Sequence, residues 1–132
     1  MSDTFCPLPW MHLATHPEGK ATLCCVSDHT NNRSAARTKG EVLNLNRHKV
    51  IEIVNSDLYI NTRQEMRNGL KPKPCLRCYE EEDTLIKSKR QLELERFGTD
   101  YTDYDGMIQP NLKFIELRLG NLCNVRCRTC NP

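Results

Sequence analysis

The sequence predicts a small α+β protein in which a cysteine-rich hairpin and helices come first, and one further strand with a cysteine loop follows. Three observations predict this class. A turn with proline and glycine separates two strand-like segments near the N-terminus, and helical segments with start and stop signals fill the middle of the chain. Residues 112–119 then alternate apolar and polar side chains directly before three closely spaced cysteines.

The composition limits the compartment and the partners. The chain has 132 residues, 38% of them apolar, and a net charge of +2, which is too small to indicate nucleic-acid binding. It has no apolar run of the roughly 18 residues that a membrane helix needs, and no signal peptide, so we expect no membrane partner. A cytoplasmic chain keeps its thiols reduced, and the eight cysteines are therefore interpreted as metal ligands before disulfides.

The first element is a hairpin within residues 5–26. Residues 10–15 and 20–26 suit strands, and His16-Pro17-Glu18-Gly19 supplies the turn, because proline presets its own φ and glycine accepts a positive φ. Residues 27–41 are polar and without periodicity, which predicts a surface loop.

Two helices are expected in the middle of the chain. Residues 55–57 can cap a helix that ends at Gly69. The Lys-Pro-Lys-Pro segment that follows breaks the helix and places Cys75 and Cys78 on a tight loop. The second helix is expected from about Cys78 to about Phe97, and a connector over residues 99–111 leads to the strand at 112–119.

Three cysteines after that strand form the pattern C-x₃-C-x₂-C: Cys123, Cys127 and Cys130. A loop this short can bring three thiolates around one inorganic cluster. Three thiolates are one fewer than the irons of a cubane cluster require, so one iron would stay open to a small molecule.

A second group of cysteines has the composition of a complete four-thiolate site: Cys6, Cys24 or Cys25, Cys75 and Cys78. The C-x₂-C pair can direct two sulfurs at one metal, and the base of the hairpin can bring two more. Adjacent strand residues point to opposite faces, so Cys24 and Cys25 are not expected to share the site, but alternation does not decide which one serves. Spacing alone is compatible with an iron–sulfur cluster or with structural zinc.

These cysteine patterns resemble a known superfamily. The C-x₃-C-x₂-C loop after a strand is similar to the cluster motif of radical S-adenosylmethionine (radical SAM) enzymes. The C-x₁₂-G-x₄-C pattern from Cys6 to Cys24, with the later C-x₂-C, resembles the auxiliary-cluster modules of that superfamily, the twitch and SPASM domains. The segments Phe-Cys-Pro-Leu-Pro-Trp-Met-His-Leu, Lys-Pro-Cys-Leu-Arg-Cys-Tyr-Glu-Glu-Glu and Ile-Glu-Leu-Arg-Leu-Gly-Asn-Leu-Cys resemble twitch-domain radical SAM proteins that carry the extra module in front.

The resemblance implies a role for each cysteine group. It assigns Cys123, Cys127 and Cys130 to a four-iron four-sulfur cluster that binds S-adenosylmethionine (SAM). It assigns four further cysteines to an auxiliary cluster, and it favours Cys24 over Cys25 as one of them: Cys6, Cys24, Cys75 and Cys78. One position departs from the pattern, because Thr129 stands where the superfamily usually has an aromatic residue and cannot stack on adenine.

The resemblance also implies a domain order. Residues 1–98 would form the twitch- or SPASM-like auxiliary-cluster domain, and residues 99–111 the connector. Residues 112–132 would begin a radical SAM domain, the first strand and cluster loop of an incomplete, partial TIM-type α/β barrel. We expect the rest of the barrel in the same or another chain, and no catalysis by this chain alone.

The implied function is reductive cleavage of SAM to a 5′-deoxyadenosyl radical, with an external electron donor and a peptide or protein as the possible substrate. Two other functions fit the cysteines. One is a small zinc-stabilised Cys₄ module that recruits a protein or a nucleic acid, and the other is a non-catalytic electron-transfer fragment.

Overall fold

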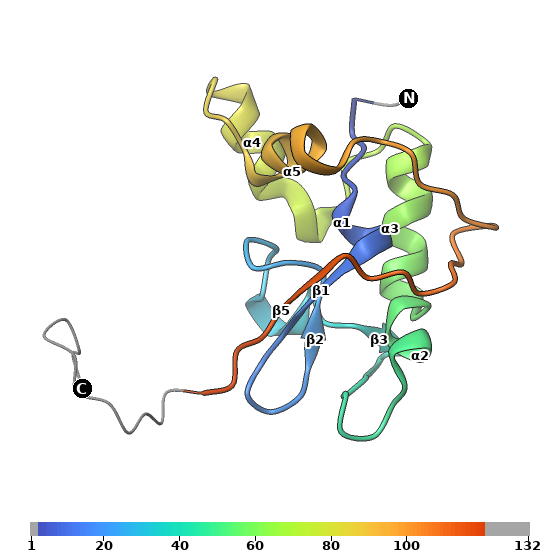
Figure 1. The fold of residues 1–132 in the computed structure, drawn as a ribbon. Coiled ribbons are helices and arrows are strands. Elements are labelled where there is room, and N and C mark those ends of the chain that lie inside the picture. The colour runs from blue at the N-terminus through green and yellow to red at the C-terminus, as the bar shows by residue number, and fades with distance from the viewer. Residues whose placement is uncertain (1–2, 121–132) are drawn as a thin grey trace, which may run out of the picture.

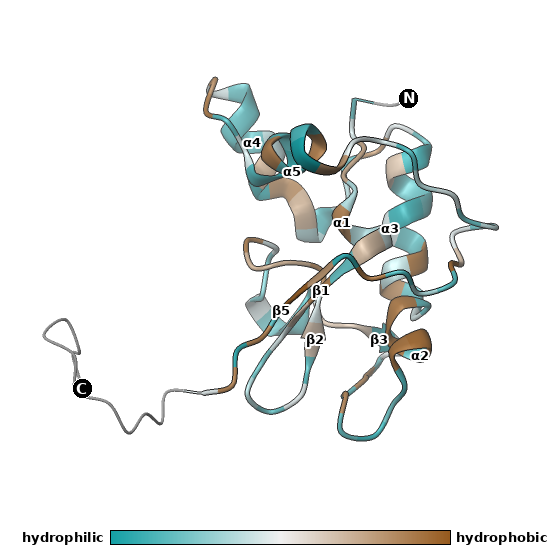
Figure 2. Cartoon of the chain, in the orientation of Figure 1, coloured by the Kyte–Doolittle hydropathy of each residue, from teal (hydrophilic) through white to brown (hydrophobic). Residues whose placement is uncertain are grey.

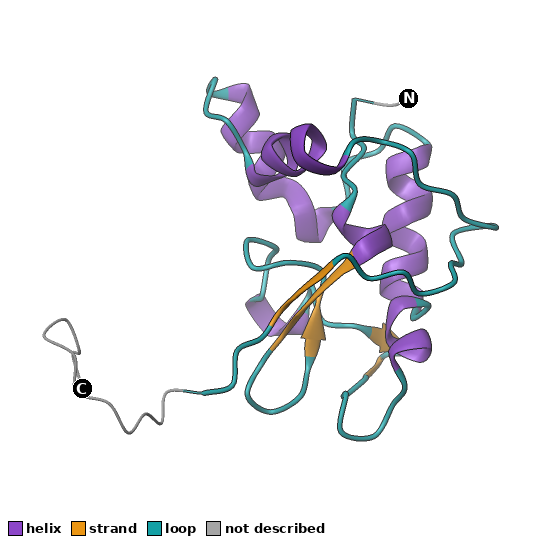
Figure 3. Ribbon diagram, viewed as in Figure 1, coloured by secondary structure: helices purple, strands orange, loops and turns teal. Residues whose placement is uncertain are grey.

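The computed structural model describes residues 3–120 and shows the expected small α+β fold (Figures 1 and 3). A sheet in the order β2-β1-β5 lies in the middle of the molecule, α3 runs along one side, and α4 and α5 lie together beyond the start of β1 (Figure 1). The helices are α1 (Leu8–Met11), α2 (Val50–Val54), α3 (Asp57–Arg67), α4 (Leu76–Asp83) and α5 (Lys89–Phe97), with 3₁₀ turns η1 (Thr30–Asn32) and η2 (Lys73–Cys75). The strands are β1 (His12–Thr15), β2 (Ala21–Thr22), β3 (Arg37–Thr38), β4 (Glu41–Val42) and β5 (Phe114–Glu116).

The predicted hairpin is present, with shorter strands than expected. β1 and β2 pair antiparallel, and the turn is closed by the amide of His16, which donates to the carbonyl of Lys20 at 2.9 Å. Residues 10 and 11, expected in the first strand, instead end the helical turn α1, which begins after Pro7 and contains Pro9. The second strand stops at Thr22, because the chain turns at Cys24, whose carbonyl accepts a hydrogen bond from Ser27 Oγ at 2.7 Å.

The prediction of a surface loop over residues 27–41 was wrong in part. Ser34, Ala35 and Ala36 are fully buried, and the amide of Ala36 donates to the carbonyl of Ala21 at 2.8 Å. These small side chains fit against β2 and continue its hydrogen bonding, and the short hairpin β3–β4 follows. Polar neighbours on both sides hid this buried segment from a reading of periodicity.

The helix predicted after residues 55–57 is α3, and Gly69 follows its end with a φ of +74°. Ser56 occupies the N-cap position, but its hydroxyl makes no capping hydrogen bond and is buried without a partner among residues 3–120. The short helix α2 directly before it was not expected, and its residues are mostly hydrophobic (Figure 2).

The single helix predicted from Cys78 to Phe97 was wrong, because the chain forms α4 and α5 with a break between them. Leu85, in the break, adopts a φ of +62°, a left-handed conformation that no helix interior contains. Ser88 then caps α5 by accepting from the amide of Gln91 at 3.2 Å. The prediction that Cys75 and Cys78 lie on a tight loop was also wrong, since Cys75 ends the 3₁₀ turn η2 and is the N-cap of α4, and Cys78 lies in the first turn of that helix.

The connector over residues 99–111 contains no helix or strand, and it brings β5 alongside β1 in a parallel pair. Phe114 of β5 stacks on Phe97 with ring centroids 5.6 Å apart, and it packs against His12 at 4.1 Å. The opposite face of this segment is exposed, with 45% of Ile115, 62% of Leu117 and 84% of Leu119 accessible. Figure 2 shows this apolar stretch running along the strand.

A buried arginine on α3 joins the helices to the connector. Arg63 is fully buried and donates to the carbonyls of Gly106 and Pro9, both at 2.6 Å, and to the carbonyl of Val54. Burial lowers its pKa to about 10, so the guanidinium stays charged at neutral pH. Within residues 3–120, no helix is long and apolar enough to cross a membrane.

Candidate metal centre

Four of the predicted cysteine ligands line one pocket: Cys6, Cys24, Cys75 and Cys78. They come from three separate parts of the chain, namely the segment before α1, the turn after β2, and the start of α4. Three of these residues are buried and Cys75 is half-buried. The other walls are mostly apolar, with Leu8, Leu23 and Met66 among them, so the thiols face a largely dry space.

The local backbone presents amide groups to three of these sulfurs. The amide of Leu8 donates to the sulfur of Cys6 as α1 begins, and the amides of Val26 and Ser27 donate to that of Cys24 as the chain turns. The amide of Arg90, in the first turn of α5, donates to the sulfur of Cys78. Such hydrogen bonds favour the thiolate form and are among the factors that set the potential of a cluster bound to it.

Burial dominates the electrostatics of the four thiols. It raises the pKa of Cys24 to about 11 and that of Cys6 still further, and the neighbouring cysteines add to both shifts. Burial also raises the pKa of Cys75 and Cys78. The thiols are therefore neutral when nothing binds them, and binding of a metal must release their protons.

Two cations offset the negative charge that deprotonation would create. Lys89 and Arg90 both line the pocket from the N-terminal turn of α5. Arg90 is fixed by an ion pair with Glu82, whose Oε1 lies 2.9 Å from the arginine Nε, and it donates to the carbonyl of Phe5 at 2.8 Å. Neither residue was predicted as part of the site from the sequence, because a single helix was expected there; the cap of α5 at Ser88 was the signal that could have revealed them.

Within residues 3–120, no group of three His, Cys, Asp or Glu side chains is drawn together closely enough to hold one metal ion. The four thiols surround the pocket instead of meeting at a point. The donor set still fits an iron–sulfur group, because each thiolate of a cubane binds its own iron and the ligands stand around a body several atoms wide. A single zinc ion would need all four sulfurs at about 2.3 Å.

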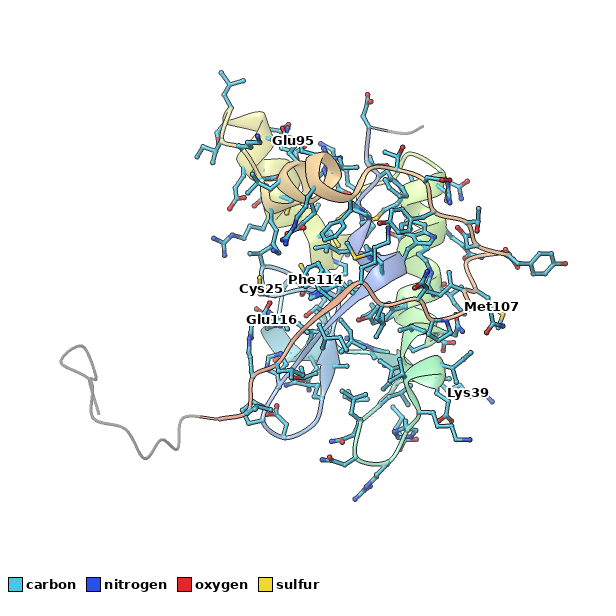
Figure 4. All side chains as sticks on the ribbon, viewed as in Figure 1. Cys25, Lys39, Glu95, Met107, Phe114 and Glu116 are labelled. Atoms are coloured by element: carbon cyan, nitrogen blue, oxygen red, sulfur yellow. The ribbon has the colours of Figure 1, made fainter. Side chains whose placement is uncertain are left out.

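Cys25 points away from this pocket. Its thiol is hydrogen-bonded to the carboxylate of Glu116, and Figure 4 shows Cys25 beside Glu116 and Phe114 at β5. The structure therefore brings Cys24, and not Cys25, to the other three cysteines. The remaining predicted ligands, Cys123, Cys127 and Cys130, lie outside the described residues.

Comparison with known families identifies this region. The family model SPASM, described as an iron-sulfur cluster-binding domain, matches residues 6–79. No curated protein and no solved structure matches the chain. The matched segment covers more than half of the 132 residues and contains all four cysteines of the pocket. The chain therefore belongs to the SPASM family of iron–sulfur cluster-binding domains.

Proposed function

We propose that Cys6, Cys24, Cys75 and Cys78 bind an auxiliary iron–sulfur cluster in the N-terminal part of a radical SAM enzyme. The observation that carries the proposal is that the four thiols line one largely apolar pocket inside the segment that the SPASM family model matches. Backbone amides on three of the sulfurs, and the cations of α5, support it further, because a cluster with four thiolates is negatively charged.

The motif of Cys123, Cys127 and Cys130 supports the second part of the proposal, a four-iron four-sulfur cluster with one open iron that binds SAM. When bound, this cluster would supply the electron that cleaves SAM to a 5′-deoxyadenosyl radical. A peptide or protein is the proposed substrate, an external donor supplies the electron in the cytoplasm, and the rest of the barrel lies in the same or another chain. The C-x₃-C-x₂-C motif supports this SAM chemistry, and the pocket of four cysteines supports the auxiliary cluster.

The first experiment determines which metal the protein holds. The protein is purified without oxygen, and iron, acid-labile sulfide and zinc are measured per chain. We expect iron and sulfide in equal amounts and visible charge-transfer absorption. A colourless protein with zinc and no sulfide would instead support the alternative function, a Cys₄ module that recruits a protein or a nucleic acid.

Adjacent cysteines provide a matched pair of variants for the auxiliary site. Cys24→Ala removes a thiol from the pocket, whereas Cys25→Ala removes one that faces Glu116. We expect the first variant to lose about half of the bound iron and the second to keep it. Equal iron loss in both variants would contradict the assignment of Cys24.

The second cluster is tested by Cys127→Ala, which should remove the other half of the iron and leave the pocket of the auxiliary site loaded. SAM is then added to the reduced wild-type chain, and 5′-deoxyadenosine is measured. We expect binding of SAM without turnover, because the barrel that would position SAM and substrate is not provided by the described residues. Sustained formation of 5′-deoxyadenosine by the 132-residue chain would contradict this expectation.

A further inference from the structure

Helix α5 lies outside the segment that the family model matches, yet its first turn reaches the cysteine pocket. The side chains of Lys89 and Arg90 line the pocket, and the backbone amide of Arg90 donates to the sulfur of Cys78. The family match, which ends at residue 79, therefore does not account for the charge on this side of the pocket.

The placement of α5 is determined by features of the chain on both sides of it. The left-handed residue Leu85 turns the chain back, so that α5 lies beside α4 (Figure 1). Ser88 caps the helix, and its hydroxyl also donates to Oε1 of Glu82. The ion pair between Arg90 and Glu82 joins the two helices next to the pocket.

Lys89 is held in position by the same helix. Its Nζ lies 2.9 Å from Oε1 of Glu93, one turn further along α5, and Glu93 does not line the pocket. Burial by itself would lower the pKa of Lys89, but the hydrogen bond to Glu93 and the charge of that carboxylate raise it. Lys89 is therefore a cation at neutral pH.

We propose that α5 controls the redox chemistry of the auxiliary cluster, with Lys89 as the residue that raises its reduction potential. The inference rests on the proposed function, because it requires an iron–sulfur cluster in the pocket. Lys89 is a positioning and tuning residue, and the four cysteines remain the ligands.

The physical reason is the charge of the cluster. Four thiolates make the bound cluster negative, and reduction adds one more electron, so a nearby cation stabilises the reduced form more than the oxidised form. The apolar walls of the pocket strengthen this effect, because water screens it poorly there. Removing the cation must therefore make the cluster harder to reduce.

The test compares two lysines two residues apart. Lys89→Gln removes the cation at the pocket, where 24% of the side chain is exposed, and Lys87→Gln removes one that does not line it and is 52% exposed. A third variant, Lys89→Arg, keeps the charge. Iron and sulfide are measured for each protein, and the reduction potential of the auxiliary cluster is followed by electron paramagnetic resonance in the Cys127→Ala background, which removes the proposed second cluster.

We expect all three lysine variants to keep the iron of the auxiliary cluster. The potential should become more negative in Lys89→Gln and stay close to that of the parent protein in Lys89→Arg and Lys87→Gln. An unchanged potential in Lys89→Gln, or an equal shift in Lys87→Gln, would overturn the inference while leaving the proposed function intact. If the parent protein contains zinc and no iron, the proposed function fails, and the inference fails with it.

Discussion

Asp103 joins three parts of the chain through one carboxylate. Its Oδ2 accepts from the indole nitrogen of Trp10 at 3.0 Å and from Nε of Arg67 at 3.1 Å, and its Oδ1 accepts from the amide of Gly106 at 2.9 Å. Burial alone would raise the pKa of Asp103, but these three donors together lower it. The predicted connector is therefore attached to α1 and α3 by a charged residue that its sequence did not single out.

This carboxylate makes stability depend on pH. A lowered folded-state pKa contributes stability that is fully present above the ordinary aspartate pKa of roughly 3.9 and is lost as the pH falls through the folded value. We expect Asp103→Asn to cost about 1–2 kcal/mol of unfolding free energy at neutral pH, and less as the pH falls below 4. The measurement is urea unfolding of both proteins, followed by circular dichroism over this pH range.

The wild-type protein is the reference for Asp103→Asn at every pH. Because the two proteins carry the same cluster ligands, the difference between their unfolding free energies reports on Asp103 alone. A difference in unfolding free energy that is the same at neutral and acidic pH would show that the carboxylate charge does not act in this way. Asp100, an exposed aspartate in the same connector, gives a control as Asp100→Asn, for which we expect a small difference at all pH values.

Cys24 and Cys25 are adjacent in the sequence, and tertiary packing decides which of them faces the cysteine pocket. The sequence predicts from strand alternation that the two side chains face different ways, and they do so in the structure although both lie in the turn after β2. Which face meets the other cysteines depends on α1, α4 and β5, which pack there from distant parts of the chain. Alternation within the hairpin does not contain that information, and only the resemblance of the C-x₁₂-G-x₄-C pattern favoured Cys24.

At the scale of elements, the turn of the first hairpin depends on Gly19. Its φ is +88°, and an added Cβ would lie 2.4 Å from Oδ1 of Asn44. Asn44 cannot easily move away, because its Nδ2 donates to the carbonyl of Glu18 at 2.6 Å and its Oδ1 accepts from the amide of Asn46 at 2.8 Å. The turn therefore requires glycine for its conformation and for its space.

Gly40 has the same need for a left-handed backbone but no crowding, because its φ is +81° and an added Cβ would meet nothing within 4 Å. It therefore serves as the control for the contact with Asn44. We expect Gly40→Ala to cost about 1 kcal/mol, the strain of a left-handed alanine. Gly19→Ala should cost more, about 2–4 kcal/mol, because the contact with Asn44 adds to the strain. Thermal unfolding of the two variants measures the difference, and equal losses would show that the contact with Asn44 relaxes without cost.

The two helices α4 and α5 show the limit of prediction from periodicity. Apolar residues recur at helical spacing through residues 85–94, so the pattern predicts one continuous helix. The observed break places the ion pair between Glu82 and Arg90 beside the pocket, where both side chains are largely buried. Tertiary contacts of this kind outweigh a weak local preference.

At the scale of the whole molecule, the cysteine pocket connects segments that share few local contacts. Cys6, Cys24 and Cys78 belong to the N-terminal segment, the hairpin and α4, respectively. Removal of the metal should therefore loosen the attachment of α4 to the hairpin. We expect anaerobic chelation to lower the free energy of unfolding by several kcal/mol, which is less than the contribution on the order of 10 kcal/mol that structural zinc makes in small domains.

Thermal unfolding before and after chelation tests this expectation. The melting temperature should fall by the same amount in wild type and Cys25→Ala, and Cys24→Ala should start from the low value and change little. An unaltered melting temperature in wild type after complete iron removal would show that the apolar core alone holds these segments together.

The sequence by itself determined the α+β class, the hairpin turn at residues 16–19, α3, and the cysteines that line the pocket. These features are encoded by neighbouring residues: turn chemistry, helix caps and the C-x₂-C spacing. Only the tertiary structure decided that Cys25 faces Glu116 of β5, that β5 pairs with β1, and that Lys89 and Arg90 supply the cations of the pocket. Each of these depends on the packing of segments far apart in the chain, and the local sequence does not encode which segments meet.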